Sequence, residues 1–168
     1  MNLDHELYQI THPELKVLAE YALRNAPAYF WTCRASRNHH PPDERGEGGT
    51  ILHLKRAFKT AKYLCRAFSL EGFDRQLVLT AVLIHDICKE GTSDEGVGYT
   101  VGGHERLLGV RFSEVPQVVE NRLWLRVDRL VRSHEGIWGE KKPETLMERI
   151  VHLADYISTR EDIIVQLD

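Results

Sequence analysis

The sequence has few cysteines and no long apolar run. Cys33, Cys65 and Cys88 are an odd number and form no CxxC pair, which argues against a disulfide framework or a zinc ribbon and predicts reduced thiols. No apolar run approaches the length of a membrane span, and residues 1–10 lack the basic, apolar and small-residue succession of a secretory signal. We therefore expect a cytoplasmic protein with no membrane partner.

The sequence also lacks a large excess of charge of either sign. Its formal net charge is -3, which gives no general attraction for a phosphate backbone or an anionic membrane. A long nucleic acid is therefore not expected as a partner. A small phosphorylated molecule, such as a nucleotide, is the better expectation.

What the chain does have is the composition of an ordinary globule. With 168 residues, 42% of them hydrophobic and 28% charged, it is long enough to bury one core. We expect a single domain over residues 1–168. Its core spans about residues 50–160, and a helix and loop within residues 1–49 pack on that core.

Helical periodicity dominates the sequence, and strand-like alternation is nowhere sustained. Apolar stripes predict helices over about residues 12–24, 50–71, 74–86, 104–112, 123–134 and 143–157. Thr50 and Asp74 are the expected N-caps of the second and third helices, and Pro143 is expected to open the last. Gly136 is placed to end the helix before it. The fold class is therefore all-α, a compact helical bundle.

Candidate metal ligands stand at or near the ends of these predicted helices. They are His53, His85, Asp86, His104, His134 and Asp155. Imidazole nitrogens and carboxylate oxygens together suit iron, manganese, zinc and similar divalent ions. Because His85 and Asp86 are adjacent at a helix end, they can address two ions, and Asp86 is then the natural bridge. Asp155 lies among apolar residues, where an unpaired carboxylate is costly unless it is bonded or binds a metal.

Other polar and aromatic residues have two interpretations each. His39, His40 and His152 are expected to be ordinary loop or helix residues rather than metal ligands. Trp138 and Tyr99 either stack on a base or complete the core. The loop that leads into His53 should lie over a metal centre, and its candidate phosphate contacts are Arg37, His40 and Arg45. The alternative for this loop is a solvated connection.

The order of these motifs resembles the HD-domain metal phosphohydrolase superfamily. The resemblance rests on His53, Ile84-His85-Asp86-Ile87-Cys88-Lys89-Glu90-Gly91, Gly103-His104-Glu105, Ser133-His134-Glu135-Gly136 and His152-Leu153-Ala154-Asp155-Tyr156-Ile157. It spans roughly residues 50–160. The two extra histidines, His104 and His134, look like the binuclear subgroup, which includes HD-GYP cyclic-dinucleotide phosphodiesterases and HD-type diadenosine tetraphosphatases. The chain lacks the extended GYP signature and the paired histidines of the former, and its compact size is closer to the latter.

The resemblance implies two divalent ions, iron or manganese first, with zinc, cobalt or nickel as alternatives. These ions would activate a bridging water as hydroxide and polarise a phosphoryl oxygen. Asp86 would bridge the ions and orient that water. Lys89 would contact a substrate phosphate and offset charge in the transition state. The other interpretation of Lys89 is a helix C-terminal lysine favoured by the helix dipole.

Three functions remain in competition at this point. The first is hydrolysis of a phosphoester or phosphoanhydride in a nucleotide-like small molecule. The second is a di-iron HD-type oxygenase acting on a polyol or phosphonate, which uses the same ligand set. The third is a regulatory module that binds a nucleotide without turning it over. The short interval from His134 to Asp155 and the similarity to the tetraphosphatase pattern favour hydrolysis.

Overall fold

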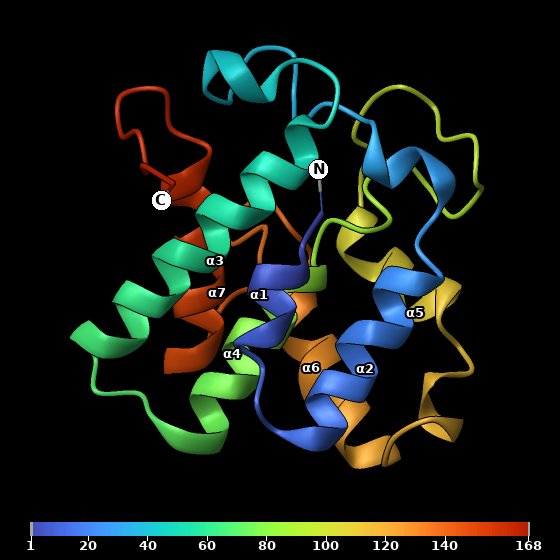
Figure 1. Ribbon diagram of the computed structural model, residues 1–168, viewed down its shortest axis with the longest axis vertical. Helices are drawn as coiled ribbons and strands as arrows, with labels where there is room; N and C mark the ends of the chain where they lie inside the picture. The colour runs from blue at the N-terminus through green and yellow to red at the C-terminus, as the bar shows by residue number, and fades with distance from the viewer. Residues whose placement is uncertain (1, 168) are drawn as a thin grey trace.

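The computed structural model describes residues 2–167, except for the side chain of Pro116. Its α-helices are α1 (Asp4–Tyr8), α2 (Pro13–Arg24), α3 (Gly49–Ala67), α4 (Gly72–Ile84), α5 (Leu107–Arg111), α6 (Asn121–Arg132) and α7 (Leu146–Ser158). Between these helices lie the short 3-10 helices η1 (Ala28–Trp31), η2 (Pro42–Glu44), η3 (His104–Arg106) and η4 (Val115–Gln117). No strand occurs among the described residues. The prediction of an all-α fold is confirmed (Figure 1).

Helix α4 is the centre of the bundle. All of its residues from Gln76 to Ile84 are buried, and α2, α3, α6 and α7 each pack against it. A helix that is apolar on every side has this place because it has no polar face to turn toward water. The buried side chains of these helices join one continuous hydrophobic cluster. Since α4 ends at Ile84, the residues that follow it, His85 and Asp86, are also buried, at the end of the central helix.

Helices α3 and α7 lie side by side, with the C-terminal segment at one end of the pair (Figure 1). The hydroxyl oxygens of Thr60 on α3 and Ser158 on α7 are 3.2 Å apart. The guanidinium of Arg56 donates to the backbone carbonyl of Val165 at 3.1 Å, which ties the C-terminal segment to α3. This pairing brings two segments of chain that are about a hundred residues apart into contact.

The start of α3 differs from the prediction. The helix begins at Gly49, and Gly48 before it has a left-handed backbone with φ of +73°. Thr50 lies inside the first turn, where its hydroxyl donates to the carbonyl of Arg34 at 3.0 Å instead of capping the helix. A Cβ on Gly49 would lie 1.8 Å from the carbonyl oxygen of Glu44, so only glycine fits. The close approach of the preceding loop therefore requires a glycine at position 49 and occupies the hydroxyl of Thr50.

Two other helix starts were predicted wrongly. Glu71 is the N-cap residue of α4, and Asp74 lies within its first turn. Helix α7 begins after Thr145 rather than at Pro143. Thr145 accepts a hydrogen bond from the backbone of Glu148, and the Glu148 side chain accepts one from the backbone of Thr145, which is a capping box. The capping box satisfies more backbone donors than a proline start, so it fixes the boundary.

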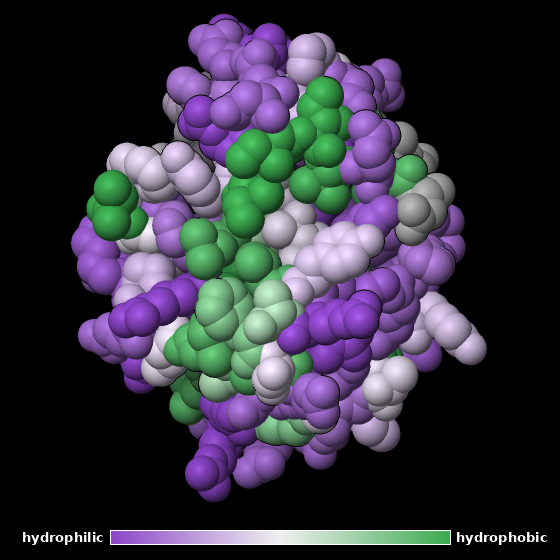
Figure 2. All heavy atoms as spheres, turned by 90° about the vertical axis from the view of Figure 1, so that its left-hand side faces the viewer, coloured by the Kyte–Doolittle hydropathy of each residue, from purple (hydrophilic) through white to green (hydrophobic). Residues whose placement is uncertain are grey.

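One face of the molecule carries a band of apolar side chains (Figure 2). It is the side on which α3, α7 and the C-terminal segment lie in Figure 1. Exposed apolar residues of these segments include Phe68, Ile163 and Ile164. Among the described residues, no helix is both long and apolar enough to cross a bilayer.

Candidate metal centre

The structure brings all six predicted metal ligands together. His53 is on α3, His85 caps the C-terminal end of α4 with Asp86 directly after it, and Asp155 is on α7. His104 opens η3, and His134 follows the end of α6. Every one of these side chains is buried except that of Asp155, which is partly exposed. Residues from five separate elements therefore meet at the end of the central helix.

Two of these side chains, His53 and His85, contact Asp155. The carboxylate oxygen Oδ1 of Asp155 is 2.9 Å from Nε2 of His53 and 3.4 Å from Nε2 of His85. Nε2 of His85 is also 3.8 Å from Oδ1 of Asp86. His53, His85 and Asp86 offer ligand atoms that all lie within 4.8 Å of one another. This is one group able to hold an ion.

A second group of candidate ligands also includes Asp86. Its Oδ1 is 3.2 Å from Nε2 of His104 and 3.9 Å from Nε2 of His134. The two Nε2 atoms of His104 and His134 are 3.0 Å apart. Asp86, His104 and His134 again offer ligand atoms within 4.8 Å of one another. Asp86 belongs to both groups, as a bridging carboxylate would.

The histidine rings are oriented by the backbone. In three of them Nδ1 lies within hydrogen-bond distance of the carbonyl three residues earlier: His85 with Val82 at 2.8 Å, His104 with Val101 at 3.2 Å and His134 with Val131 at 2.8 Å. A carbonyl can only accept, so Nδ1 carries the proton and Nε2 of the neutral ring presents a lone pair. Metal-binding histidines are usually held in this way.

Several histidine nitrogens of the site have lone pairs with no hydrogen-bond donor, which is the state in which they bind metal ions. Among the described residues, no hydrogen bond is made by the buried Nε2 of His85 or by either ring nitrogen of His53, although Nε2 of His53 lies 2.9 Å from the Asp155 carboxylate. The Nε2 atoms of His104 and His134 face each other, although neither carries a proton when its ring is neutral. Buried polar atoms without partners are costly. Divalent ions held by the Nε2 atoms and the two carboxylates would give each Nε2 atom a partner, and Nδ1 of His53, on the other side of its ring, would face Glu44 at 3.7 Å.

The two carboxylates stay ionised. Burial alone would raise the pKa of Asp86, but Lys89, His85 and His104 hold that pKa well below its ordinary value. Burial likewise opposes ionisation of Asp155, whose pKa is held well below its ordinary value by His53 and His85. Both groups are therefore available as negatively charged ligands at neutral pH.

Lys89 lies against this centre. Its side chain is buried, its ammonium donates to the carbonyl of Ala35, and Nζ is 3.6 Å from Oδ2 of Asp86. A lysine placed only for the helix dipole would extend into solvent. Here the ammonium forms part of the wall of the cavity.

A cavity of about 850 Å³ opens over the centre. Asp86, His104, His134 and Asp155 line its floor, and His40 and Lys89 line it as well. Of the three predicted phosphate contacts in the loop, His40 is the one that lines this cavity. Arg45 donates to the carbonyl of His40 and pairs with Glu161 on the rim. Arg37 lines a smaller neighbouring cavity of about 230 Å³, together with Tyr99.

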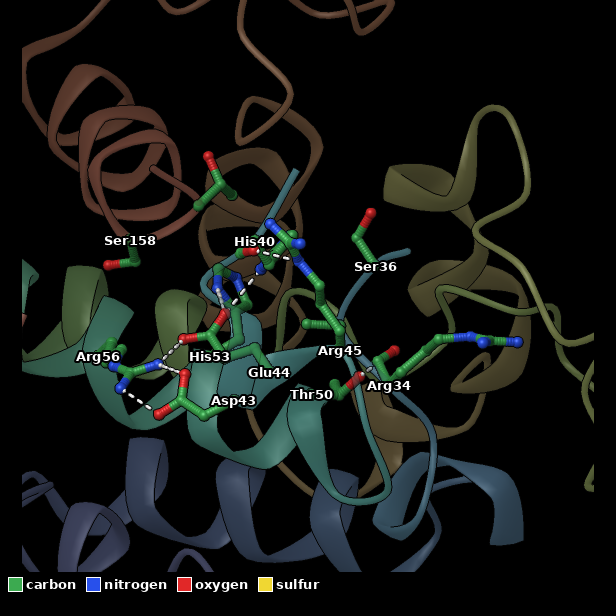
Figure 3. Close-up of polar contacts among 12 residues, drawn as sticks. Arg34, Ser36, His40, Asp43, Glu44, Arg45, Thr50, His53, Arg56 and Ser158 are labelled. Carbon is green, nitrogen blue, oxygen red and sulfur yellow. Dashed lines mark hydrogen bonds and ion pairs between the residues drawn. The ribbon is translucent and has the colours of Figure 1, made fainter. Parts of the chain in front are cut away.

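Sequence reasoning missed Glu44, which is completely buried beside the centre (Figure 3). Its carboxylate accepts a hydrogen bond from Nη1 of Arg56 at 2.6 Å and lies 2.7 Å from Nδ1 of His40. It is also 3.7 Å from Nδ1 of His53. Glu44 thus holds the His40 ring and stands behind a candidate ligand. No local pattern marks it, because it lies in a polar loop.

Glu135 was also missed as a member of the site. Its Oε1 is 3.4 Å from Nε2 of His104 and 3.5 Å from Nε2 of His134. The bond with His134 lowers the pKa of Glu135 below its ordinary value. Its side chain lines the cavity. Its place directly after His134 in the sequence was the one available signal.

Comparison with known proteins gives one match. No curated protein and no solved structure matches the chain significantly. Residues 50–160 match the sequence profile of the HD domain, and this segment contains all six candidate ligands. The HD domain is typical of a superfamily of metal-dependent phosphohydrolases. The chain belongs to the HD domain family.

Proposed function

We propose that the protein hydrolyses a phosphoester or phosphoanhydride bond of a nucleotide-like small molecule, with two divalent ions as cofactors. The mixed nitrogen and oxygen donor set suits iron, manganese, zinc and similar divalent ions, and the resemblance to the binuclear subgroup puts iron or manganese first. The observation that carries the proposal is the position of Asp86, which belongs to two groups of buried ligand atoms and lines the cavity together with His104 and His134. A carboxylate has two oxygens and can bind two ions at once.

The residues of the chain have separate tasks in this reaction. Bound ions would lower the pKa of a coordinated water and polarise the phosphoryl group. His53, His85, His104, His134 and the two aspartates would hold them, with Asp86 between the two groups. Lys89 supplies a fixed positive charge 3.6 Å from Asp86, where a phosphate oxygen would gain charge. His40, held at Nδ1 by Glu44, keeps Nε2 for contact with the substrate.

The size of the cavity and the net charge of the protein favour a small substrate. A volume of about 850 Å³ lies in the usual range for pockets that bind small molecules, about 300–1,000 Å³. It exceeds what a single phosphate group needs. The net charge of -3 gives a long nucleic acid no general attraction. A phosphorylated molecule with a body of nucleotide size fits both observations.

The test combines metal analysis with assays on the same anaerobic sample. The protein is loaded in turn with iron, manganese, cobalt, nickel or zinc and assayed with phosphomonoester, phosphodiester and nucleotide substrates. We expect two metals per chain and hydrolysis that is lost in Asp86→Asn. The matched control is Asp128→Asn, because Asp128 is a buried aspartate on α6 that pairs with Arg132 at 2.7 Å.

Each result has a clear meaning. Hydrolysis with two ions in the wild type and in Asp128→Asn, but not in Asp86→Asn, supports the binuclear phosphohydrolase. Two irons per chain with oxygen consumption and no hydrolysis would support the di-iron oxygenase instead. Binding of a nucleotide without turnover, whichever metal is loaded, would support the regulatory module. Less than one metal per chain would refute the six-ligand site.

A further inference from the structure

An aromatic platform stands on the rim of the metal cavity. The rings of Trp138 and Tyr156 are stacked, with centroids 5.8 Å apart and an angle of 19° between their planes. The guanidinium of Arg160 lies over the Tyr156 ring, 5.7 Å from its centroid. These three residues all line the cavity of about 850 Å³. We call them the aromatic platform.

The platform is carried by the same elements as the metal ligands. Trp138 follows His134 by four residues, and Tyr156 follows Asp155 directly on α7. Nδ1 of His152 is 2.7 Å from the carbonyl oxygen of His134, and its ring lies 6.2 Å from that of Trp138. A side chain on Gly136 would collide with the His152 ring at 2.1 Å. His152 therefore links the platform to a candidate ligand, which fixes the distance between them.

The exposure of Trp138 has no structural explanation within the described residues. Its side chain is 65% exposed, so it adds little to the core. A stacked pair of large rings beside a cavity, with one ring largely in water, offers a surface on which a ligand can bind. A flat aromatic ring gains stacking energy there in addition to burial, whereas an aliphatic chain gains burial alone. Ser36, Asn38 and Thr159 also line this cavity and can form hydrogen bonds with the edge of a bound ring.

We infer that the aromatic platform binds a planar aromatic ring of the substrate, such as a nucleobase, while its phosphoryl group lies at the metal centre. The inference rests on the proposed function in one respect, because it takes the metal centre as the place where the phosphoryl group binds. It assigns Trp138 and Tyr156 to substrate specificity and Arg160 to the support of the Tyr156 ring. His152 is a positioning residue.

The test compares two ligands, one with an aromatic base and one without it. Adenosine 5′-monophosphate and ribose 5-phosphate are titrated into the metal-loaded full chain, and their dissociation constants are measured by calorimetry. Loss of one stacked base costs about tenfold in affinity. We therefore expect Trp138→Ala to raise the dissociation constant of adenosine 5′-monophosphate about tenfold. The dissociation constant of ribose 5-phosphate should not change. Trp138→Phe should keep most of the affinity, because it keeps a ring.

Tryptophan fluorescence gives a second readout that does not depend on turnover. Trp124 is buried in the core, and Trp31 packs against Phe30, so Trp138 is the most exposed of the three tryptophans. We expect the adenosine ligand to quench the emission of the wild type but not that of Trp138→Phe. The control is Tyr63→Ala, because this tyrosine is 58% exposed on α3 and does not line the metal cavity.

The inference and the proposed function fail in different ways. Equal affinity for the two ligands in the wild type, or an equal loss of both in Trp138→Ala, would refute the aromatic platform. Hydrolysis at the same kcat/KM for substrates with and without an aromatic ring would also refute the aromatic platform, but it would still support the phosphohydrolase. Selective binding of the adenosine ligand with no hydrolysis under any metal would refute the proposed function alone.

Discussion

Replacement of Arg56 by alanine should be among the most destabilising single changes in the protein. Arg56 donates to Oε1 of Glu44 at 2.6 Å and forms two bonds with Asp43, at 2.9 and 2.8 Å. Glu44 is completely buried, whereas the Asp43 side chain is more than half exposed. The arginine is therefore the main positive charge that compensates the buried carboxylate of Glu44.

The expected cost follows from this geometry. Removing one partner of a buried ion pair costs about 3–5 kcal/mol, since the other charge remains buried. The exposed bonds to Asp43 add less than about 1 kcal/mol. Arg24→Ala is the control, because Arg24 also pairs with a carboxylate, that of Glu20 at 3.8 Å, but is largely exposed. Its free energy of unfolding should fall by less than about 1 kcal/mol.

The assay is urea unfolding at 25 °C and pH 7.5 with EDTA in every sample, so that metal binding does not contribute. The double variant Arg56→Ala/Glu44→Gln separates the cost of the stranded Glu44 carboxylate from the loss of the bonds that Arg56 itself makes. If the stranded carboxylate causes the loss, the double variant will be more stable than Arg56→Ala alone. A cost in Arg56→Ala as small as that in Arg24→Ala, or a double variant less stable than Arg56→Ala, would refute this reasoning.

Two further predictions concern acid stability and metal loading. Burial opposes ionisation of Glu148, but Arg129 and the backbone of Thr145 and Glu144 lower its pKa to about 2. The folded pKa lies below the unfolded one, so its contribution is full above about pH 4.5 and is lost as the pH falls toward 2. Urea unfolding in that window should show a smaller loss in Glu148→Gln than in the wild type, and equal losses would contradict the prediction. A metal at 100 times its dissociation constant should raise the free energy of unfolding by about 2.7 kcal/mol, and Asp86→Asn should abolish this gain. An equal gain in both proteins would show that the ion binds elsewhere.

The sequence alone predicted the helical architecture and the residues that the structure brings together as candidate metal ligands. Apolar residues at helical spacing gave α2, the buried α4 and most of α6, because this periodicity is a property of near neighbours in the chain. The types and order of His53, His85-Asp86, His104, His134 and Asp155 predicted a metal centre and the resemblance to the HD domain. The profile match over residues 50–160 confirms that resemblance.

Only the tertiary structure decided how individual polar side chains are used. Glu44 is buried because η2 folds against α3 and brings it to Arg56, twelve residues later. Residue 49 must be a glycine because the carbonyl of Glu44 leaves no room for a Cβ. Trp138 had two interpretations in the sequence, and packing leaves it exposed beside Tyr156. Each outcome depends on contacts between segments that are distant in sequence or joined by irregular loops, and no local periodicity encodes such contacts.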